Sequence, residues 1–261
     1  MMIIDKLAYS SKLRYKSPML KTIFAVGTLL ICVASHMLAV SAIILAFMAA
    51  LTIVFSRVSL MHYTKLMSIP LGFLILSTIT IVVNISDTPM DFFSLAIGGK
   101  YLVASSTSLT EGIRLIMVAL SSVSCLYFLT LTTPMIDILV VLRTLRCPKI
   151  IVELMMLIYR YIFVVLDMAS AIKTSQNCRL GNKDFITELR SVGQMLTVLL
   201  VRSMNRSSCL FDAMESRCYN GEILVLEEYC PAKTSELILV IGFLSMMLAI
   251  TVSLKMLGGV L

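Results

Sequence analysis

Few residues in this sequence of 261 could perform chemistry. Gly98-Gly99-Lys100 is the nearest match to a phosphate-binding loop, but the upstream glycine is missing and Tyr101 stands where Ser or Thr is needed. The two histidines, His36 and His62, fall in separate predicted loops and form no metal-binding cluster. The seven cysteines include no C-x-x-C pair, and the nineteen methionines fit flexible packing of apolar runs. We therefore expect a protein that is not an enzyme and binds no cofactor or metal itself.

Arginines at the ends of two predicted helices are the strongest functional candidates. They lie in two triplets, Cys178-Arg179-Leu180 and Ser216-Arg217-Cys218. Each triplet stands just before a glycine or an Asn-Gly pair that ends a helical pattern. An arginine at a helix C-terminus is favoured by the helix dipole and can fork onto the carboxylate of a partner. The alternative is that both arginines cap their own helices or meet lipid phosphates. Possible supporting residues are Arg160, Arg202 and Arg206.

The composition indicates what must position these arginines. Hydrophobic residues make up 59% of the chain and charged residues only 14%, against roughly a quarter in an average soluble domain. A water-soluble protein could not cover its surface with so few polar residues, so lipid is the expected solvent. Five mostly apolar segments approach the roughly 20 residues that a spanning helix needs. They are Thr22–Ser35, Met37–Phe55, Leu66–Ile85, Ile113–Leu131 and Glu236–Leu257.

Charges in the connecting segments predict the orientation. The arm before the first span carries five Lys or Arg and one acid, and the segment from 132 to 235 carries twelve Lys or Arg. The loop from 86 to 112 is acidic instead. Under the positive-inside rule the N-terminus, the 56–65 loop and the long segment are cytoplasmic. We expect a multi-pass protein of the plasma membrane whose first span is retained and not cleaved as an export signal. The basic cytoplasmic segments account for the net charge of +7, so we expect no nucleic-acid partner. The expected environment of the chain is the lipid bilayer.

The segment between the last two spans is too patterned for a disordered loop. We predict a short helix over Met135–Leu145, then a long helix over Ile150–Ser175. Its Glu153 and Arg160 favour a position at the interface or against protein, although a sixth span or a re-entrant helix remains open for residues 150–166. We expect Gly181 to end this helix as its C′ glycine, before a second long helix from about Lys183 to Arg217. The predicted division is 1–131 for the arm and four spans, 132–233 for the coupling region and 234–261 for the last span.

The order and spacing of several short motifs resemble those of the T-component of energy-coupling factor transporters, most closely the CbiQ-type subunit of cobalt and nickel importers. The matching stretches are Ile4 to Arg14, Leu109 to Ile113, Thr132-Thr133-Pro134, Leu142-Arg143, Cys147-Pro148, Tyr159-Arg160-Tyr161, Arg202 to Arg206 and Ala213 to Gly221. The resemblance runs over most of the chain. It implies an all-α membrane bundle of about five spans that carries two long cytoplasmic coupling helices.

The family's Ala-Arg-Gly motifs correspond to the two triplets. Both arginines are kept, while Leu180 and Cys218 replace the glycines. The resemblance implies that two cytoplasmic ABC ATPases use ATP, that Arg179 and Arg217 anchor the coupling helices in them, and that a separate membrane subunit captures cobalt or nickel. A vitamin importer of the same type is the nearest alternative. A stand-alone permease or an intramembrane enzyme would instead need convergent polar residues at membrane depth, where the sequence shows scattered Ser and Thr.

Overall fold

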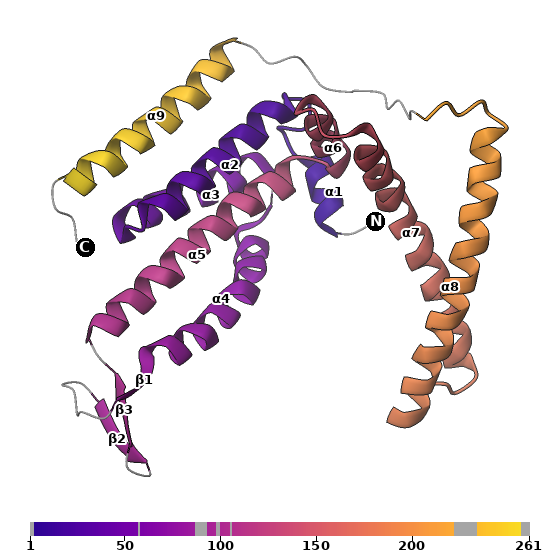
Figure 1. Ribbon diagram of the computed structural model, residues 1–261, viewed down its shortest axis with the longest axis horizontal. Helices are drawn as coiled ribbons and strands as arrows, with labels where there is room; N and C mark the ends of the chain where they lie inside the picture. Colours follow the sequence, from indigo (N-terminus) through magenta and orange to yellow (C-terminus); the bar gives the residue numbers. More distant parts are fainter. Residues whose placement is uncertain are drawn as a thin grey trace. The chain divides into compact units, whose positions relative to one another are not determined.

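The computed structural model describes residues 3–56, 58–86, 93–97, 100–104, 106–221 and 234–256 (Figure 1). The predicted loop charges Arg57, Asp87 and Asp91 lie outside them. The chain separates into two compact units, one formed by residues 2–138 with 228–261 and the other by residues 139–227. The functional division predicted at residues 132 and 233 stays a prediction.

The first unit is a helical bundle with five helices, within the described residues, that are long and apolar enough to cross a membrane. Its elements are α1 (Ile3–Ser10), α2 (Pro18–Ser35), α3 (Leu38–Ser56), α4 (Leu60–Val82), α5 (Ser106–Thr132) and α9 (Thr234–Met256). The predicted helical membrane bundle is confirmed. The predicted bounds were wrong by four to seven residues at the starts of α2, α4 and α5, because a helix continues past its apolar run wherever its backbone hydrogen bonds continue. His62, predicted in a loop, lies in α4, whereas His36 ends α2 with φ 49°.

Aromatic and aliphatic side chains form the core between the spans. Ile44 and Met48 of α3 are fully buried beside the α2 and α5 side chains. Phe24 of α2 meets Phe128 of α5 edge-on, with ring centroids 5.6 Å apart. Phe243 of α9 lies 5.4 Å from the Phe24 ring and stacks on the Phe47 ring at 4.5 Å. These contacts fasten α9 to the N-terminal spans, and Figure 1 shows it running beside α2.

A small sheet follows α4. Its strands β1 (Val83–Ser86), β2 (Phe93–Ile97) and β3 (Lys100–Ala104) pair antiparallel in the order β1-β3-β2. Residues 83–85, predicted as the end of the third span, are therefore strand. Ile97 pairs with Lys100, so Gly98 and Gly99, which lie outside the described residues, separate two neighbouring strands.

The second unit holds two long antiparallel helices that pack along each other (Figure 1). The short helix α6 (Met135–Thr144) leads into it, followed by α7 (Lys149–Cys178) and α8 (Phe185–Glu215). The three predicted helices are present. With 30 and 31 residues at 1.5 Å per residue, α7 and α8 are each about 45 Å long. Neither is among the helices apolar enough to span a membrane.

Candidate functional site

The C-terminal end of α7 is closed by a Schellman motif that carries Arg179. The amide of Gly181 donates to the Gln176 carbonyl at 2.9 Å and the amide of Leu180 donates to the Asn177 carbonyl at 3.1 Å. These are the two bonds that define the motif. They make Arg179 the C-cap and place Leu180 at the C′ position with φ 58°. The prediction that Gly181 is the C′ residue was therefore wrong, because Leu180 holds that position and Gly181 follows it.

The end of α8 repeats this geometry around Arg217. The amide of Tyr219 donates to the Met214 carbonyl at 3.0 Å, and the amide of Cys218 donates to the Glu215 carbonyl at 2.9 Å. Cys218 stands at the C′ position with φ 58°, the same value as Leu180. The two triplets predicted from the sequence thus form the same backbone turn, in which the arginine is followed by a left-handed residue.

The left-handed backbone at Leu180 and Cys218 explains why the resemblance leads us to expect glycine at these two positions. Glycine is the usual C′ residue because it has no Cβ to clash in this conformation. Leu180 and Cys218 keep the conformation without the glycine, at a cost of roughly 1–2 kcal/mol each. At both turns a residue with a side chain therefore occupies a backbone conformation that glycine adopts at lower cost.

Both arginines have exposed side chains. Arg179 and Arg217 are exposed and form no ion pair with any described residue. Because α7 and α8 are antiparallel, the two arginines lie at opposite ends of the hairpin, about 45 Å apart. We call residues 178–181 the first tip and residues 216–219 the second tip. The structure thus places the two candidate arginines far from each other, one at each end of the hairpin.

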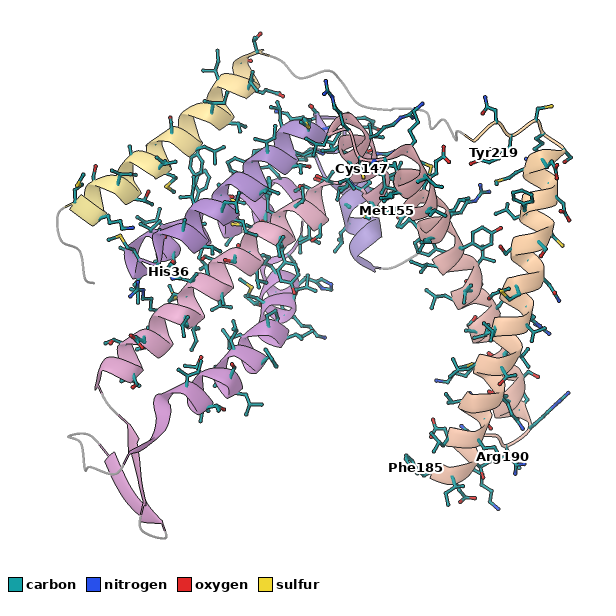
Figure 2. The ribbon with its side chains drawn as sticks, in the orientation of Figure 1. His36, Cys147, Met155, Phe185, Arg190 and Tyr219 are labelled. Atoms are coloured by element: carbon teal, nitrogen blue, oxygen red, sulfur yellow. The ribbon has the colours of Figure 1, made fainter. Side chains whose placement is uncertain are left out.

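Interactions with α8 hold the first tip. The Gln176 side-chain amide donates to the Ser191 carbonyl at 2.8 Å, and the Ser191 hydroxyl donates to the Gly181 carbonyl at 2.8 Å. A Cβ on Gly181 would lie 2.9 Å from both the Gln176 carbonyl oxygen and the Ser191 Oγ. Gly181 is therefore required by close packing. Figure 2 shows Phe185 and Arg190 at this end of the hairpin.

A side-chain hydrogen bond joins the second tip to α7. The Tyr219 hydroxyl donates to Oε2 of Glu153 in the first turns of α7, at 2.9 Å. This hydrogen bond to a carboxylate raises the pKa of the Tyr219 phenol. Tyr219 lies at the hairpin end opposite Phe185 (Figure 2). Glu153, taken from the sequence as a sign of an interfacial helix, therefore also has a partner within the hairpin.

The three supporting arginines lie along the helices and away from the tips. Arg160 is exposed on α7, and Arg202 and Arg206 are exposed on α8. The structure places none of them in a hydrogen bond or ion pair with a described residue. Apolar side chains on α8 are also widely exposed, including Phe185, Leu189, Leu196, Leu200 and Met204. The hairpin thus offers both apolar and cationic surface.

Polar residues in the spans converge more than the sequence suggested. Ser121 of α5 and Cys32 of α2 meet with Oγ and Sγ 2.7 Å apart, and the Thr28 hydroxyl donates to the Phe24 carbonyl at 2.9 Å. The hydroxyls of Tyr63 on α4 and Ser124 on α5 lie 2.8 Å apart. Cys32, Ser121 and Ser124 are fully buried, so the Cys32–Ser121 and Tyr63–Ser124 contacts join neighbouring helices, whereas the Thr28 bond lies within α2.

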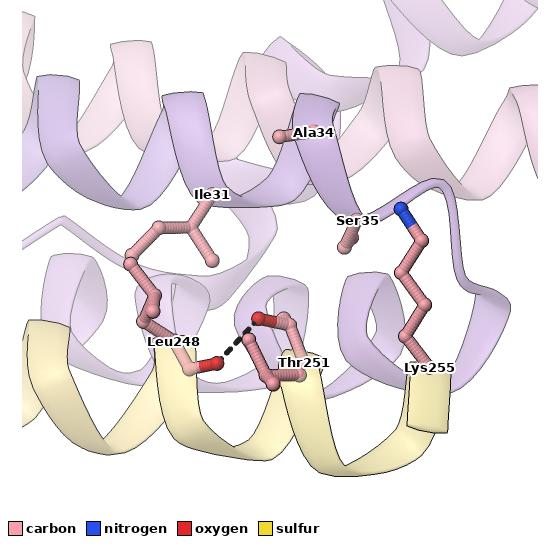
Figure 3. A pocket seen from close by; sticks show the side chains of 7 residues that line it. Ile31, Ala34, Ser35, Leu248, Thr251 and Lys255 are labelled. Atoms are coloured by element: carbon pink, nitrogen blue, oxygen red, sulfur yellow. Dashed lines mark hydrogen bonds between the residues drawn. The ribbon is translucent and has the colours of Figure 1, made fainter. Parts of the chain in front are cut away.

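A shallow groove of about 190 Å³ lies between α2 and α9 (Figure 3). Ile31, Leu248 and Val252 give it apolar walls, and Ser35 and Lys255 stand at one end. Its lining includes no carboxylate, thiol or imidazole. The described residues elsewhere contain no group of three or more His, Cys, Asp or Glu that could hold a metal ion.

A buried lysine fixes the end of the bundle where the first span begins. Lys21 of α2 is only 6% exposed, and its ammonium donates to the carbonyl of Leu13 at 3.1 Å and of Thr132 at 3.3 Å. Nearby, the Ser56 hydroxyl donates to the Leu131 carbonyl at 3.2 Å. Lys21, counted in the sequence as one more charge in the polar arm, therefore joins that arm, α2 and the end of α5.

A model of the CbiQ family, described as cobalt transport protein, matches residues 10–226. The chain belongs to this family of cobalt transport proteins. It is 34% identical over 225 residues to an uncharacterized protein of Methanocaldococcus jannaschii, covering 86% of this chain and 83% of that one. It is 29% identical over 223 residues to the cobalt transport protein CbiQ of Rhodobacter capsulatus, covering 85% and 86%. Against the putative fused cobalt transport protein CbiMQ of Methanocorpusculum labreanum it is 33% identical over 228 residues, covering 87% of this chain and 38% of the relative.

Membership of the CbiQ family confirms the resemblance seen in the sequence. Together with the five apolar helices it establishes a multi-pass membrane protein of cobalt transport. The match ends at residue 226, so it includes both tips of the hairpin. The bonds that hold those tips were missed in the sequence, because Glu153 and Tyr219 are 66 residues apart and neither residue type signals the other.

Proposed function

We propose that this chain is the membrane coupling subunit of an energy-coupling factor importer for cobalt. Two cytoplasmic ATPases bind and hydrolyse ATP, and their closure displaces the α7–α8 hairpin. The chain passes this motion to a separate membrane subunit that captures the ion. In this arrangement the N-terminus and the hairpin face the cytoplasm and the spans lie in the plasma membrane. The chain itself carries out no chemical step.

The observation that carries the proposal is the pair of matching tips. Arg179 and Arg217 follow the same helix-ending turn, stand exposed at the two ends of one hairpin, and have no partner among the described residues. A guanidinium offers donors in a fork that matches a carboxylate, and the C-terminal end of a helix favours a cation. Two equivalent anchors about 45 Å apart suit two equivalent partner subunits.

The fused relative supports the choice of partner and ion. Its name joins CbiM and CbiQ in one cobalt transport protein, and this chain matches only 38% of its length. The remainder of that protein is long enough to contain a second subunit. For this chain we infer a separate membrane partner of the CbiM kind, which captures cobalt, rather than a vitamin-binding partner.

Charge reversal at the tips tests the proposal. The chain is purified with its ATPases as wild type, as Arg179→Glu with Arg217→Glu, and as the control Arg190→Glu, an exposed arginine of α8 near the first tip. We expect the double variant to lose most bound ATPase, since truncating a buried charged pair at an interface typically costs about 2–5 kcal/mol. The control should retain it. Equal recovery of ATPases with all three proteins would refute the assignment of the tips.

A further inference from the structure

We propose that Glu153 and Tyr219 are positioning residues whose hydrogen bond holds the second tip, and with it Arg217, in place on α7. The inference rests on the proposed function for its purpose, although the bond itself can be tested without a partner. The Tyr219 hydroxyl donates to Glu153 Oε2 at 2.9 Å, two residues after Arg217. No assigned role of the chain requires this bond.

The second tip needs such a bond because its backbone is strained. Cys218 adopts φ 58°, which a residue with a Cβ rarely occupies unless surrounding contacts enforce it. The turn is made by two backbone bonds, from Cys218 to the Glu215 carbonyl and from Tyr219 to the Met214 carbonyl. Helix ends fray when only such local bonds hold them. A tertiary bond from the residue that completes the turn is placed where it prevents this fraying.

Comparison with the first tip shows that both tips are tied to the opposite helix. The first tip is fastened to α8 by two side-chain hydrogen bonds, both involving Ser191, and by the close approach at Gly181. The second tip is joined to α7 by the hydrogen bond from Tyr219 to Glu153. Each arginine is thus tied to the helix opposite its own. A force applied at either tip is therefore transmitted to both helices, and the hairpin moves as one rigid unit.

The chemistry of the bond suits a contact that must hold the second tip on α7. The acceptor is a carboxylate, and hydrogen bonds to charged acceptors are about twice as strong as neutral ones. The donor is the Tyr219 hydroxyl, carried by a rigid ring with only two χ angles, so little conformational freedom is lost when the side chain is held. Loss of the hydroxyl alone leaves the ring in place and removes the bond.

Hydrogen–deuterium exchange of the full chain in lipid nanodiscs tests the bond directly. We compare wild type, Tyr219→Phe, Glu153→Gln and the control Tyr161→Phe, a tyrosine of α7. In Tyr219→Phe the peptide covering the second tip should exchange at least fivefold faster, while the peptide covering the first tip remains unchanged. Glu153→Gln keeps an acceptor oxygen and should fall between the two, and the control should match wild type. Unchanged exchange at the second tip in Tyr219→Phe would overturn the inference.

A coupling ratio separates positioning from simple stability. In vesicles that contain the chain with its ATPases and capturing subunit, Tyr219→Phe should lower the number of cobalt ions moved per ATP hydrolysed at least threefold. The ratio is taken per assembled complex, so that any weaker binding of the ATPases by the loosened tip does not contribute to it. An unchanged ratio alongside faster exchange would overturn the positioning role. If wild type binds no ATPase while Tyr219→Phe still loosens the tip, the proposed function fails and the bond stands.

Discussion

Replacing Gly181 by alanine should open the first tip, and the size of the effect follows from the structure. The added Cβ would stand 2.9 Å from the Gln176 carbonyl oxygen and 2.9 Å from the Ser191 Oγ. The Gln176 carbonyl is fixed backbone that already accepts the amides of Arg179 and Gly181 at 3.0 and 2.9 Å. Ser191 can rotate away only by giving up its 2.8 Å bond to the Gly181 carbonyl.

The loss of two to three hydrogen bonds at about 1 kcal/mol each gives about 2–3 kcal/mol for Gly181→Ala. Gly193 provides the matched control, because it lies within α8 and a Cβ there would meet nothing within 4 Å. Alanine at Gly193 should stabilise the helix by about 0.8–1 kcal/mol. The same chemical change therefore has opposite signs at two glycines of one hairpin, about 3–4 kcal/mol apart.

Amide exchange across residues 176–183 measures this directly in the intact chain. Because 1.4 kcal/mol is a factor of ten, Gly181→Ala should speed exchange there by about 30–150-fold, while Gly193→Ala leaves it unchanged or slower. Binding of the ATPases should weaken only in Gly181→Ala. Equal exchange in the two variants would refute the close packing on which the estimate depends.

Two further predictions concern strain and burial. Leu180→Gly and Cys218→Gly should each leave the tip at least as stable as in wild type, with a net gain of up to about 1 kcal/mol. The reason is that relief of the left-handed strain outweighs the added freedom of the unfolded chain. Slower amide exchange at the matching tip would support this, and faster exchange would count against it. Lys21→Met should lower the thermal stability of the bundle by about 2 kcal/mol because the carbonyls of Leu13 and Thr132 lose their donor. Lys16→Met, which removes an exposed 2.9 Å ion pair to Glu236, should cost less than 1 kcal/mol; equal melting temperatures for the two lysine variants would contradict the buried role of Lys21.

The sequence predicted the spans well because lipid imposes a simple rule on each of them separately. A run of apolar residues is sufficient to identify a spanning helix, but it does not mark where the helix begins. Leu60 to Lys65 and Ser106 to Gly112 are polar enough to be taken as loops, yet their backbone continues the helices. The strands at 83–86 and 100–104 pair with each other although residues 87–99 separate them in the sequence, and hydropathy does not report such a pairing.

The candidate site was predicted in part. Both arginine triplets were identified, since an arginine before a helix break is visible in the local sequence. The left-handed backbone at Leu180 and Cys218 could not be foreseen, because neither residue prefers it. The bonds from Tyr219 to Glu153 and from Lys21 to Thr132 join residues 66 and 111 positions apart, and only the packed helices bring them together.

Cobalt uptake into sealed vesicles tests the central claim most directly. Vesicles are prepared with the ATPases and the capturing subunit, with or without this chain, and with this chain alone. We predict ATP-driven accumulation of cobalt only when all components are present, and its loss when Arg179 and Arg217 are both reversed to glutamate. Cobalt flux through the chain alone, without ATP or partners, would contradict a coupling role and establish a permease instead.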